Sequence, residues 1–382
     1  MSGVSPGLAA TGPYPRRELI DFLNDPPPSR RAHSVPSGTA EFVPLPPPPT
    51  GRHALARTAI TEFPSHERWD VPGFTSVTPW VCLYERVRVH GDGGLTTIDG
   101  VLVADTLGNC EPGRQWFAER PEGTYIVLSG PPTPLPGTWL SLLGGGHWNY
   151  YHWMLDGIGR LAAADQAMLA TCDGVLLPAG AVPEAAETIA RLGITRGRTV
   201  RHLAPGEALD LECCVVPGPM AAFDRPHPRL PRFLAAGLGS PARAGSPRRL
   251  YIDRRGTPNR RLENEDALVA ALAGHGVVPV ALEGATVAAE SALFAGAELI
   301  VAPHGAGLVN LVFAPPGCQV IELLPDAYVN WCFRRLAAAA GLHYDCVIGR
   351  MGPGAPAPAV HARTWTVSIP QVLAAMEAAA WR

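Results

Sequence analysis

The sequence predicts an α/β protein made of two lobes, and three observations support this fold class. The chain has 382 residues, which is longer than the usual single domain. Residues 249–348 alternate short apolar runs with helical patterns, as is typical of a parallel sheet covered on both faces. Residues 217–247 are rich in Pro, Arg, Gly and Ala, a composition typical of a linker. We place the boundary between the lobes in this linker.

The composition excludes several function classes. All 31 basic residues are arginines, so a lysine Schiff base is excluded, and the formal net charge of -3 gives no electrostatic reason to expect nucleic acid as a partner. The eight cysteines lack a Cys-x-x-Cys spacing, which favours reduced core thiols over disulfides or zinc ligands. We find no signal-peptide pattern and no uncharged apolar stretch of about 18 residues, so we expect no transmembrane segment and a cytoplasmic location.

Ahead of the linker, the pattern predicts an arm followed by the first lobe. Residues 1–60 contain two proline runs and scattered charge, which predict a proline-rich, loosely ordered arm without regular helix or sheet. Residues 61–235 form the N-terminal α/β lobe. Its predicted strands are 76–83, 100–104, 125–129, 138–143, 174–177 and 199–203, and its predicted helices are 149–164 and 182–192.

After the linker, residues 246–350 form the second lobe, in which strands and helices alternate. The predicted strands are 249–253, 277–282, 298–302, 319–323 and 343–348, and the predicted helices are 265–274, 286–295, 306–313 and 328–340. Residues 351–382 are a C-terminal segment with a terminal helix at 369–381. In such a sheet, ligands bind beyond the carboxyl ends of the strands.

A loop in the second lobe has the features of a phosphate-binding turn. The strand at 298–302 leads through Pro303, His304 and Gly305 into the predicted helix. Gly305 and Gly307 allow close approach of the backbone, and the helix N-terminus attracts an anion such as a diphosphate. His304 would donate to a phosphate oxygen. The alternative is a tight turn whose glycines serve packing only.

Three charged residues lie near the same edge of the predicted sheet. Arg254 and Arg255 directly follow the strand at 249–253, where a guanidinium suits phosphate. Glu322 lies among apolar neighbours in the strand at 319–323, where an unpaired carboxylate is costly. It either binds ribose or sugar hydroxyls or forms an ion pair with an arginine.

A polar stripe marks the helix predicted at 149–164. Asn149, His152, Asp156 and Arg160 recur three and four residues apart, on a different face from the apolar residues. His152 and Asp156 therefore meet as an i, i+4 pair, and either could act as a general base. The alternative is a solvated face with a surface pair of Asp156 and Arg160. No third ligand accompanies His147 and His152, so we expect no metal.

Five motifs in order resemble those of glycosyltransferase family 61. They are Asn-Tyr-Tyr-His-Trp-Met-Leu-Asp at 149–156, Asp-Arg-Arg at 253–255, Asn-Glu-Asp at 264–266, Pro-His-Gly-Ala-Gly-Leu-Val-Asn-Leu-Val-Phe at 303–313 and Val-Ile-Glu at 320–322. The resemblance spans about residues 144–324. It implies a GT-B-like fold, with two Rossmann-like lobes and a cleft between them, that transfers a sugar from a nucleotide donor with inversion.

The resemblance also implies roles for the candidate residues. The N-terminal lobe would hold the acceptor, with Asp156 or His152 as the catalytic base, and the C-terminal lobe would hold the donor. The expected donor-binding residues are Arg254, Arg255, His304, Gly305, Ala306, Gly307, Asn310 and Glu322. No Asp-x-Asp occurs in the chain, so we expect a metal-independent enzyme without a cofactor. Its partners would be a nucleotide sugar, UDP-linked by family resemblance, and a glycan acceptor in bacterial capsular or other surface polysaccharide biosynthesis.

Two alternatives belong to other function classes. One is a polysaccharide pyruvyltransferase, which has a similar two-lobed fold and also carries a His-Gly element near its C-terminal sheet. The other is a degenerate, non-catalytic GT-B-like protein that binds glycans. The polar helix with His152 and Asp156 argues against the first, and the intact polar residues at both sites argue against the second.

Overall fold

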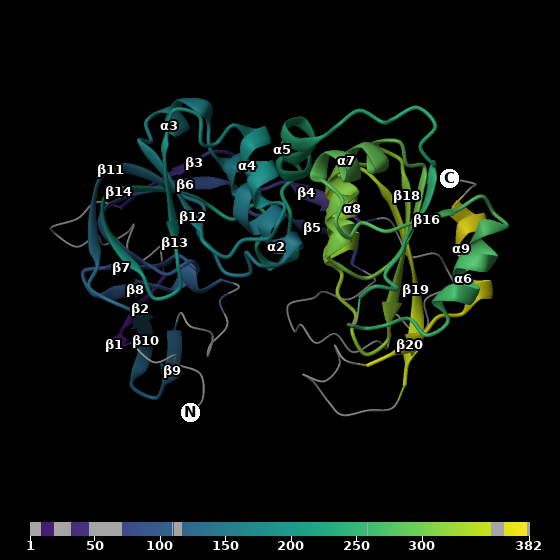
Figure 1. The fold of residues 1–382 in the computed structure, drawn as a ribbon, viewed down its shortest axis with the longest axis horizontal. Helices are drawn as coiled ribbons and strands as arrows, with labels where there is room; N and C mark the ends of the chain where they lie inside the picture. The colour runs from purple at the N-terminus through teal and green to yellow at the C-terminus, as the bar shows by residue number, and fades with distance from the viewer. Residues whose placement is uncertain are drawn as a thin grey trace. The chain divides into compact units, whose positions relative to one another are not determined.

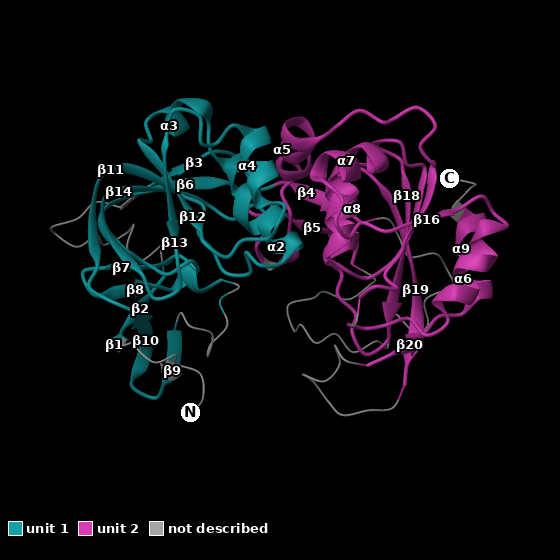
Figure 2. Cartoon of the chain, in the orientation of Figure 1, with its two compact units in different colours: residues 1–40, 78–220 teal, residues 41–77, 221–382 magenta. Residues whose placement is uncertain are grey.

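The computed structural model covers the whole chain and divides it into two compact units. It describes residues 9–18, 32–45, 71–108, 110, 117–257, 259–352 and 363–379. Unit 1 comprises residues 1–40 and 78–220, and unit 2 comprises residues 41–77 and 221–382 (Figure 2). We describe each unit by itself.

Unit 2 is built on a six-stranded sheet within the described residues, with strand order β16-β15-β17-β18-β19-β20. The strands are β15 (Arg249–Ile252), β16 (Val278–Val280), β17 (Leu299–Pro303), β18 (Gln319–Pro325), β19 (His343–Met351) and β20 (Trp365–Thr366). The first five strands in this order are parallel, and β20 pairs with β19 in the antiparallel sense. The strands predicted for the C-terminal lobe are thus confirmed within a few residues.

Helices cover both faces of this sheet (Figure 1). The helices α6 (Glu265–Ala273) and α9 (Ile369–Ala379) contact each other on one face. The other face carries α5 (Arg229–Leu238), α7 (Val287–Ala295), the 3₁₀ helix η5 (Ala306–Phe313) and α8 (Cys332–Ala339). The predicted helix at 306–313 is therefore helical but of the tighter 3₁₀ type. Both faces of β17 and β18 are buried, as the continuous apolar runs require.

The strand order of unit 2 contains a topological switch point. From β15 the chain moves to one side of the sheet to form β16 and then returns to the other side of β15 to form β17. The chain that follows β15 leads to α6 on one face of the sheet, and the chain that follows β17 leads to η5 on the other face. In open α/β sheets, ligands bind beyond the carboxyl ends of strands at such a point. The predicted donor loops follow these two strands.

Unit 1 contains a mixed sheet with the strand order β13-β12-β11-β14-β6-β7-β8-β2, with β3 also paired to β6. The strands are β2 (Arg16–Arg17), β3 (Ala32–Pro36), β6 (Trp80–His90), β7 (Leu95–Ile98), β8 (Val101–Val103), β11 (Thr133–Ser141), β12 (Gly174–Pro178), β13 (Thr199–Leu203) and β14 (Ala208–Pro217). Four neighbouring strands, from β13 to β14, are parallel. A second switch point lies between β11 and β14, because the chain leaves β11 toward β12 and returns on the other side as β14.

The remaining elements are short. A small sheet in unit 1 has the order β1-β10-β9, and a two-stranded sheet in unit 2 pairs β4 with β5. The bounds are β1 (Ala9–Tyr14), β4 (Phe42–Pro44), β5 (Gly73–Thr75), β9 (Phe117–Arg120) and β10 (Gly123–Leu128). The helical pieces are η1 (Ala104–Leu107), α2 (Tyr150–His152), η2 (Trp153–Gly157), η3 (Ile158–Ala163), α3 (Gln166–Ala170), α4 (Ala185–Leu192) and η4 (Ala222–Asp224).

The N-terminal segment differs from the loosely ordered arm that its prolines predict. In its described parts, β1 pairs with β10, β2 with β8, β3 with β6 and β4 with β5. Prolines stand at the ends of β3 and β4, at Pro36 and Pro44, where the missing N–H group costs least. The proline runs at 26–28 and 46–49 lie outside the described residues. Pro36 and Pro44 are therefore compatible with short strands in this segment, because each stands at the end of its strand.

The unit boundary lies at residue 220, inside the predicted linker. Helix α5, which the sequence-based division leaves largely in the N-terminal lobe, contacts η5 and α7 and so groups with unit 2. Residues 41–77 also group with unit 2, since β4 packs against α8.

Two further expectations concern cysteines and membrane spans. All eight cysteines are free, and burial raises the pKa of the Cys82 and Cys318 thiols to about 12, so both remain protonated at neutral pH. In the described part of the chain, no helix has both the length and the apolarity that a membrane crossing requires.

Gly174 offers a test of the packing between β11 and β12. A Cβ at Gly174 would overlap the ring of Trp139, which is 5% exposed and lies in the core of unit 1. We expect Gly174→Ala to lower the free energy of unfolding by about 1–3 kcal/mol, because the core cannot accept the extra volume without strain. Urea unfolding followed by tryptophan fluorescence measures it. Gly130→Ala is the matched control, since a Cβ there meets nothing within 4 Å, and it should stay within about 0.5 kcal/mol of the parent.

Candidate active site

The candidate site of unit 2 lies at the switch point between β15 and β17. His304 follows the last residue of β17 and is 8% exposed. Its ring packs against Tyr328 and Phe333, with centroids 5.6 Å and 5.2 Å away. Gly305 then leads into η5. The imidazole is thus fixed at the carboxyl edge of the sheet, at the N-terminal end of a helix.

A buried carboxylate holds this histidine. His304 Nδ1 lies 2.5 Å from Glu322 Oε1, and the Tyr344 hydroxyl donates to Glu322 Oε2 at 2.5 Å. Glu322 is 0% exposed, and burial raises the pKa of Tyr344 well above its ordinary value, so the phenol keeps its proton and donates. The expected arginine ion pair of Glu322 is replaced by contacts with His304 and Tyr344. The carboxylate orients the imidazole and leaves Nε2 as the ring nitrogen free of this bond.

Arg254 binds the backbone of the same loop. Its Nη1 donates to the backbone oxygen of His304 at 2.6 Å, and its backbone N–H donates to Glu265 Oε1 at 3.0 Å. A Cβ at Gly305 would overlap Arg254 Nη1, so the glycine is required for the space that the guanidinium fills. Burial lowers the pKa of Arg254 to about 10, which still leaves the side chain cationic at neutral pH. The loop glycine therefore serves packing, and the charge beside it comes from Arg254.

Arg260 is a member of this cluster that the sequence analysis missed. Its guanidinium carbon lies 4.6 Å from the centroid of the Tyr328 ring, and its charge contributes to the lowered pKa of Arg254. Its backbone φ is 48°, in the left-handed region that arginine rarely adopts. In the sequence, only the position of Arg260 in the loop after a strand could have indicated a role at the site. The many other arginines of the chain made this position uninformative.

The other residues predicted for the donor site have different surroundings. Arg255 is exposed and paired with Asp253 and Asp266, which holds the pKa of the Asp253 carboxyl below its ordinary value. Gly307 faces Leu282, whose Cδ1 would lie 2.8 Å from an added Cβ. Ala306 opens η5 and is partly exposed. Asn310 is 0% exposed and donates to Glu290 Oε2 at 2.9 Å, so it ties η5 to α7.

The candidate site of unit 1 follows the carboxyl end of β11. His152 Nδ1 and Asp156 Oδ2 are 2.7 Å apart, and the side chains are 31% and 21% exposed. With Nδ1 turned to the carboxylate, Nε2 is the ring nitrogen left to accept a proton from a hydroxyl. The pairing predicted from the i, i+4 spacing is confirmed.

The segment that carries this pair is not one regular helix. It runs through a short α-helix, a π-helical turn at Trp153–Gly157 and a 3₁₀ helix. The Trp153 indole is buried and donates to Thr188 Oγ1 at 3.0 Å, which anchors the π turn to α4. Gly146 has a φ of 75°, and a Cβ there would approach His152 Cγ to 2.8 Å. The glycine run before the helix thus makes room for the imidazole, and π turns are frequent at functional sites.

Arg160 and His147 from the same motif have structural roles. Arg160 Nη2 donates to the backbone oxygens of Leu143 at 2.8 Å and Ser141 at 3.4 Å, so it binds the end of β11 and is not part of a solvated surface pair. His147 is 5% exposed, with Nε2 3.2 Å from Asp92 Oδ2. Nowhere in the described residues do three or more His, Cys, Asp or Glu side chains form a group that could hold a metal ion.

The buried amide of Asn310 provides a test that separates packing from ligand binding. We expect Asn310→Ala to lower the free energy of unfolding by about 1–3 kcal/mol, because Glu290 loses a buried donor. Affinity for nucleoside diphosphates should stay within about twofold, since the side chain does not reach the loop surface. Thermal unfolding and calorimetry on the same preparation measure both. A loss of nucleotide affinity without a loss of stability would contradict this prediction and would indicate that Asn310 contributes to nucleotide binding.

Comparison with known proteins gives matches to the region that contains both candidate sites. Residues 150–321 match the family model described as Glycosyltransferase 61. Two β-1,2-xylosyltransferases of Oryza sativa subsp. japonica are 41% identical over 86 residues and 38% identical over 97 residues. A protein O-linked-mannose β-1,4-N-acetylglucosaminyltransferase 2 of Tetraodon nigroviridis is 39% identical over 95 residues.

These matches are local. They cover 22%, 25% and 22% of this chain and 15%, 20% and 16% of the three relatives, so the chain aligns with well under a third of each relative's length. His152, Asp156 and His304 all lie inside the segment that matches the family model. The comparisons therefore support a relationship between residues 150–321 of this chain and glycosyltransferase family 61.

Proposed function

We propose that this protein is an inverting glycosyltransferase that moves a sugar from a nucleotide-sugar donor to a hydroxyl of a glycan acceptor. The observation that carries the proposal is the position of the two histidines. His304 and His152 each follow a central parallel strand at a switch point of its own sheet, and both lie in the segment that matches the family. Switch points are where open α/β sheets bind ligands.

The donor binds at the unit 2 loop in this proposal. The leaving diphosphate needs positive charge and directed hydrogen bonds, because negative charge builds on it as the glycosidic bond breaks. His304 presents Nε2 from an imidazole fixed through Nδ1, and the N-terminal end of η5 begins beside it. Arg254 and Arg260 supply cationic charge within the same cluster. Positive charge on this loop thus comes from side chains held in place before the ligand arrives.

The base is His152, with Asp156 as its orienting partner. Inversion by a single displacement requires one group that removes the proton of the attacking hydroxyl. The carboxylate at 2.7 Å fixes the tautomer with the proton on Nδ1 and stabilises the imidazolium that forms when Nε2 accepts the acceptor proton. Of the two candidates that the sequence left open, the geometry favours His152.

We propose that the two candidate sites act together in a GT-B arrangement, in which unit 1 carries the acceptor and unit 2 the donor. The proposal requires His152 Nε2 to come within about 10 Å of the donor loop, with the donor sugar and acceptor hydroxyl between them. The named relatives transfer xylosyl and N-acetylglucosaminyl groups, so UDP-xylose and UDP-N-acetylglucosamine are the first donors to examine. Surface polysaccharide is the proposed acceptor class.

Variants of the two histidines test this proposal, because one set should affect turnover and the other should affect UDP binding. Asp156→Asn and His152→Ala should lower turnover by about 10²–10⁴-fold and leave the affinity for UDP within about twofold, because the base does not touch the donor. His304→Ala should weaken UDP binding at least about tenfold, through the loss of a hydrogen bond to a charged group. Calorimetry with UDP and donor hydrolysis assays measure the two effects.

Glu187→Gln is the control for the acidic substitutions, since Glu187 pairs with Arg191 on helix α4 and is no part of the site. It should leave both readouts unchanged. Thermal protection by phosphoenolpyruvate, with none by any nucleoside diphosphate, would overturn the proposal in favour of a pyruvyltransferase.

A metal-independent reaction is part of the proposal, because the chain has no Asp-x-Asp and places arginines beside the donor loop. Treatment with EDTA should leave turnover within about twofold of the untreated enzyme, since side chains supply the charge that a metal would otherwise provide. Steady-state donor turnover before and after chelation measures this. A tenfold loss that Mg²⁺ or Mn²⁺ restores would contradict it.

A further inference from the structure

One face of the unit 1 sheet carries polar side chains in register across four strands. Thr97 of β7 pairs with Arg88 of β6, Arg88 with Asp210 of β14, and Asp210 with Pro134 of β11. Arg86 and Glu212 line the same cavity one step further on. Val87 and Leu211, between them, also contribute to its lining and belong to the core of unit 1. None of these residues belongs to the proposed active site.

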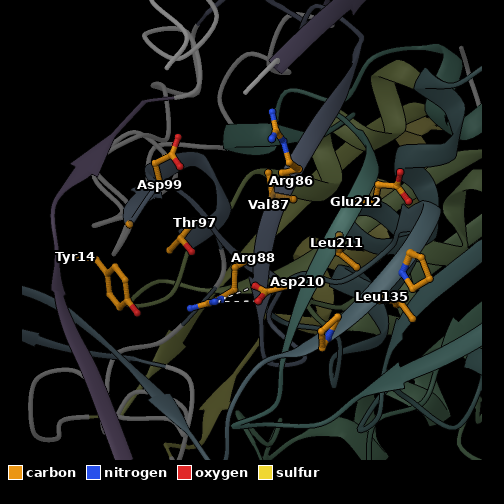
Figure 3. A pocket seen from close by; sticks show the side chains of 13 residues that line it. Tyr14, Arg86, Val87, Arg88, Thr97, Asp99, Leu135, Asp210, Leu211 and Glu212 are labelled. Atoms are coloured by element: carbon orange, nitrogen blue, oxygen red, sulfur yellow. Dashed lines mark hydrogen bonds and ion pairs between the residues drawn. The ribbon is translucent and has the colours of Figure 1, made fainter. Parts of the chain in front are cut away.

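This polar face is the floor of a cavity of about 720 Å³, a volume typical of small-molecule sites. Tyr14 and the turn at Asp99 and Gly100 complete its lining. Figure 3 shows Tyr14 and Asp99 on one side, Leu135 and Glu212 on the other, and the ion pair of Arg88 and Asp210 between them. The cavity is therefore built from strands that are distant in sequence, with a wall added by the N-terminal segment.

Two lining residues have left-handed backbones. Asp99, with a φ of 50°, forms with Gly100 the two-residue hairpin turn between β7 and β8, and this turn type requires a positive φ at both positions. Arg86 has a φ of 54° within β6, where no turn accounts for it. The surrounding structure must therefore enforce the conformation of Arg86.

The charges of the lining identify the class of ligand. Two arginines and three carboxylates line the cavity, and Arg88 is bound to Asp210 in a bidentate pair at 2.7 Å and 3.0 Å. The excess of carboxylates disfavours a phosphorylated or otherwise anionic ligand. A neutral ligand with many hydroxyls satisfies both carboxylates and guanidinium groups, and Leu135, the proline rings and the Tyr14 ring offer apolar contact for its C–H faces.

We propose that this cavity binds a neutral oligosaccharide. Pro136 of the cavity lies five residues before the carboxyl end of β11, and His152 follows that end in the chain. Five residues of a strand span roughly 15 Å, which is the length of several sugar units. The cavity thus serves as a remote subsite for the glycan acceptor. Its role as an acceptor subsite rests on the proposed function, but the binding of the sugar does not.

Oligosaccharide binding without any donor tests the proposal. We would titrate the full chain with neutral xylo-, manno-, cello- and chito-oligosaccharides of two to six units, by ligand-observed NMR and calorimetry. At least one series should bind the parent protein. Asp99→Asn combined with Glu212→Gln should weaken that binding at least about tenfold, because both substitutions remove carboxylate acceptors from the lining. Glutamine at 212 keeps an acceptor for the N–H of Gly137, and asparagine tolerates the backbone of residue 99.

Glu85→Gln is the matched control, since Glu85 lies on the same strand β6 and does not line the cavity. It should bind like the parent. The proposal is overturned if no neutral series binds, or if the double variant and the control bind equally well. Titration of the same proteins with UDP distinguishes the proposed donor site from the proposed oligosaccharide subsite. Intact oligosaccharide binding without UDP binding refutes the donor site alone, and the reverse result refutes the subsite alone.

Discussion

A carboxylate without access to water organises the loop after β17 in unit 2. Glu322 stands in the middle of a parallel sheet, where a charge is tolerated only if every lone pair has a partner. Its two oxygens are held by His304 and Tyr344, which come from the loop after β17 and from β19. The orientation of the imidazole is therefore a requirement of folding as well as of chemistry. The pair cannot separate without leaving a buried charge unpartnered.

The glycines of both motifs act through the space they leave. At Gly305 the space is taken by the guanidinium of Arg254, and at Gly146 by the imidazole of His152. A sequence pattern of glycines before a helix predicts backbone contact with a phosphate. Here each glycine instead lets a functional side chain or its brace pack against the main chain. The imidazoles of His304 and His152 are thus held in place in two separate sheets with the help of the same device.

The sequence predicted the second lobe far better than the first. In unit 2, the apolar strands and intervening helices are unambiguous because both faces of the parallel sheet are buried. In unit 1, β14 was missed although it pairs with both β11 and β6, and Leu209 and Leu211 alternate with Asp210 and Glu212. The strands of the N-terminal segment depend on partners far along the chain, which no local pattern records.

The candidate site was predicted in part. The spacing of His152 and Asp156 was sufficient, because i, i+4 neighbours meet on nearly any helical backbone. The partners of Glu322, Asn310 and Arg260 were not predictable, since each contact joins residues brought together only by the sheet or by a loop. The sequence alone therefore does not show whether a polar residue in a motif faces a ligand or a neighbouring helix or strand.

The division of the chain has a consequence for how the two units can move. Because residues 41–77 belong to unit 2 and lie between two segments of unit 1, the chain passes from one unit to the other three times, near residues 40, 77 and 220. A rotation of one unit against the other must therefore be absorbed by three peptide segments together. A single hinge would be free to twist about its own axis. Three covalent connections restrict such twisting more than one connection would.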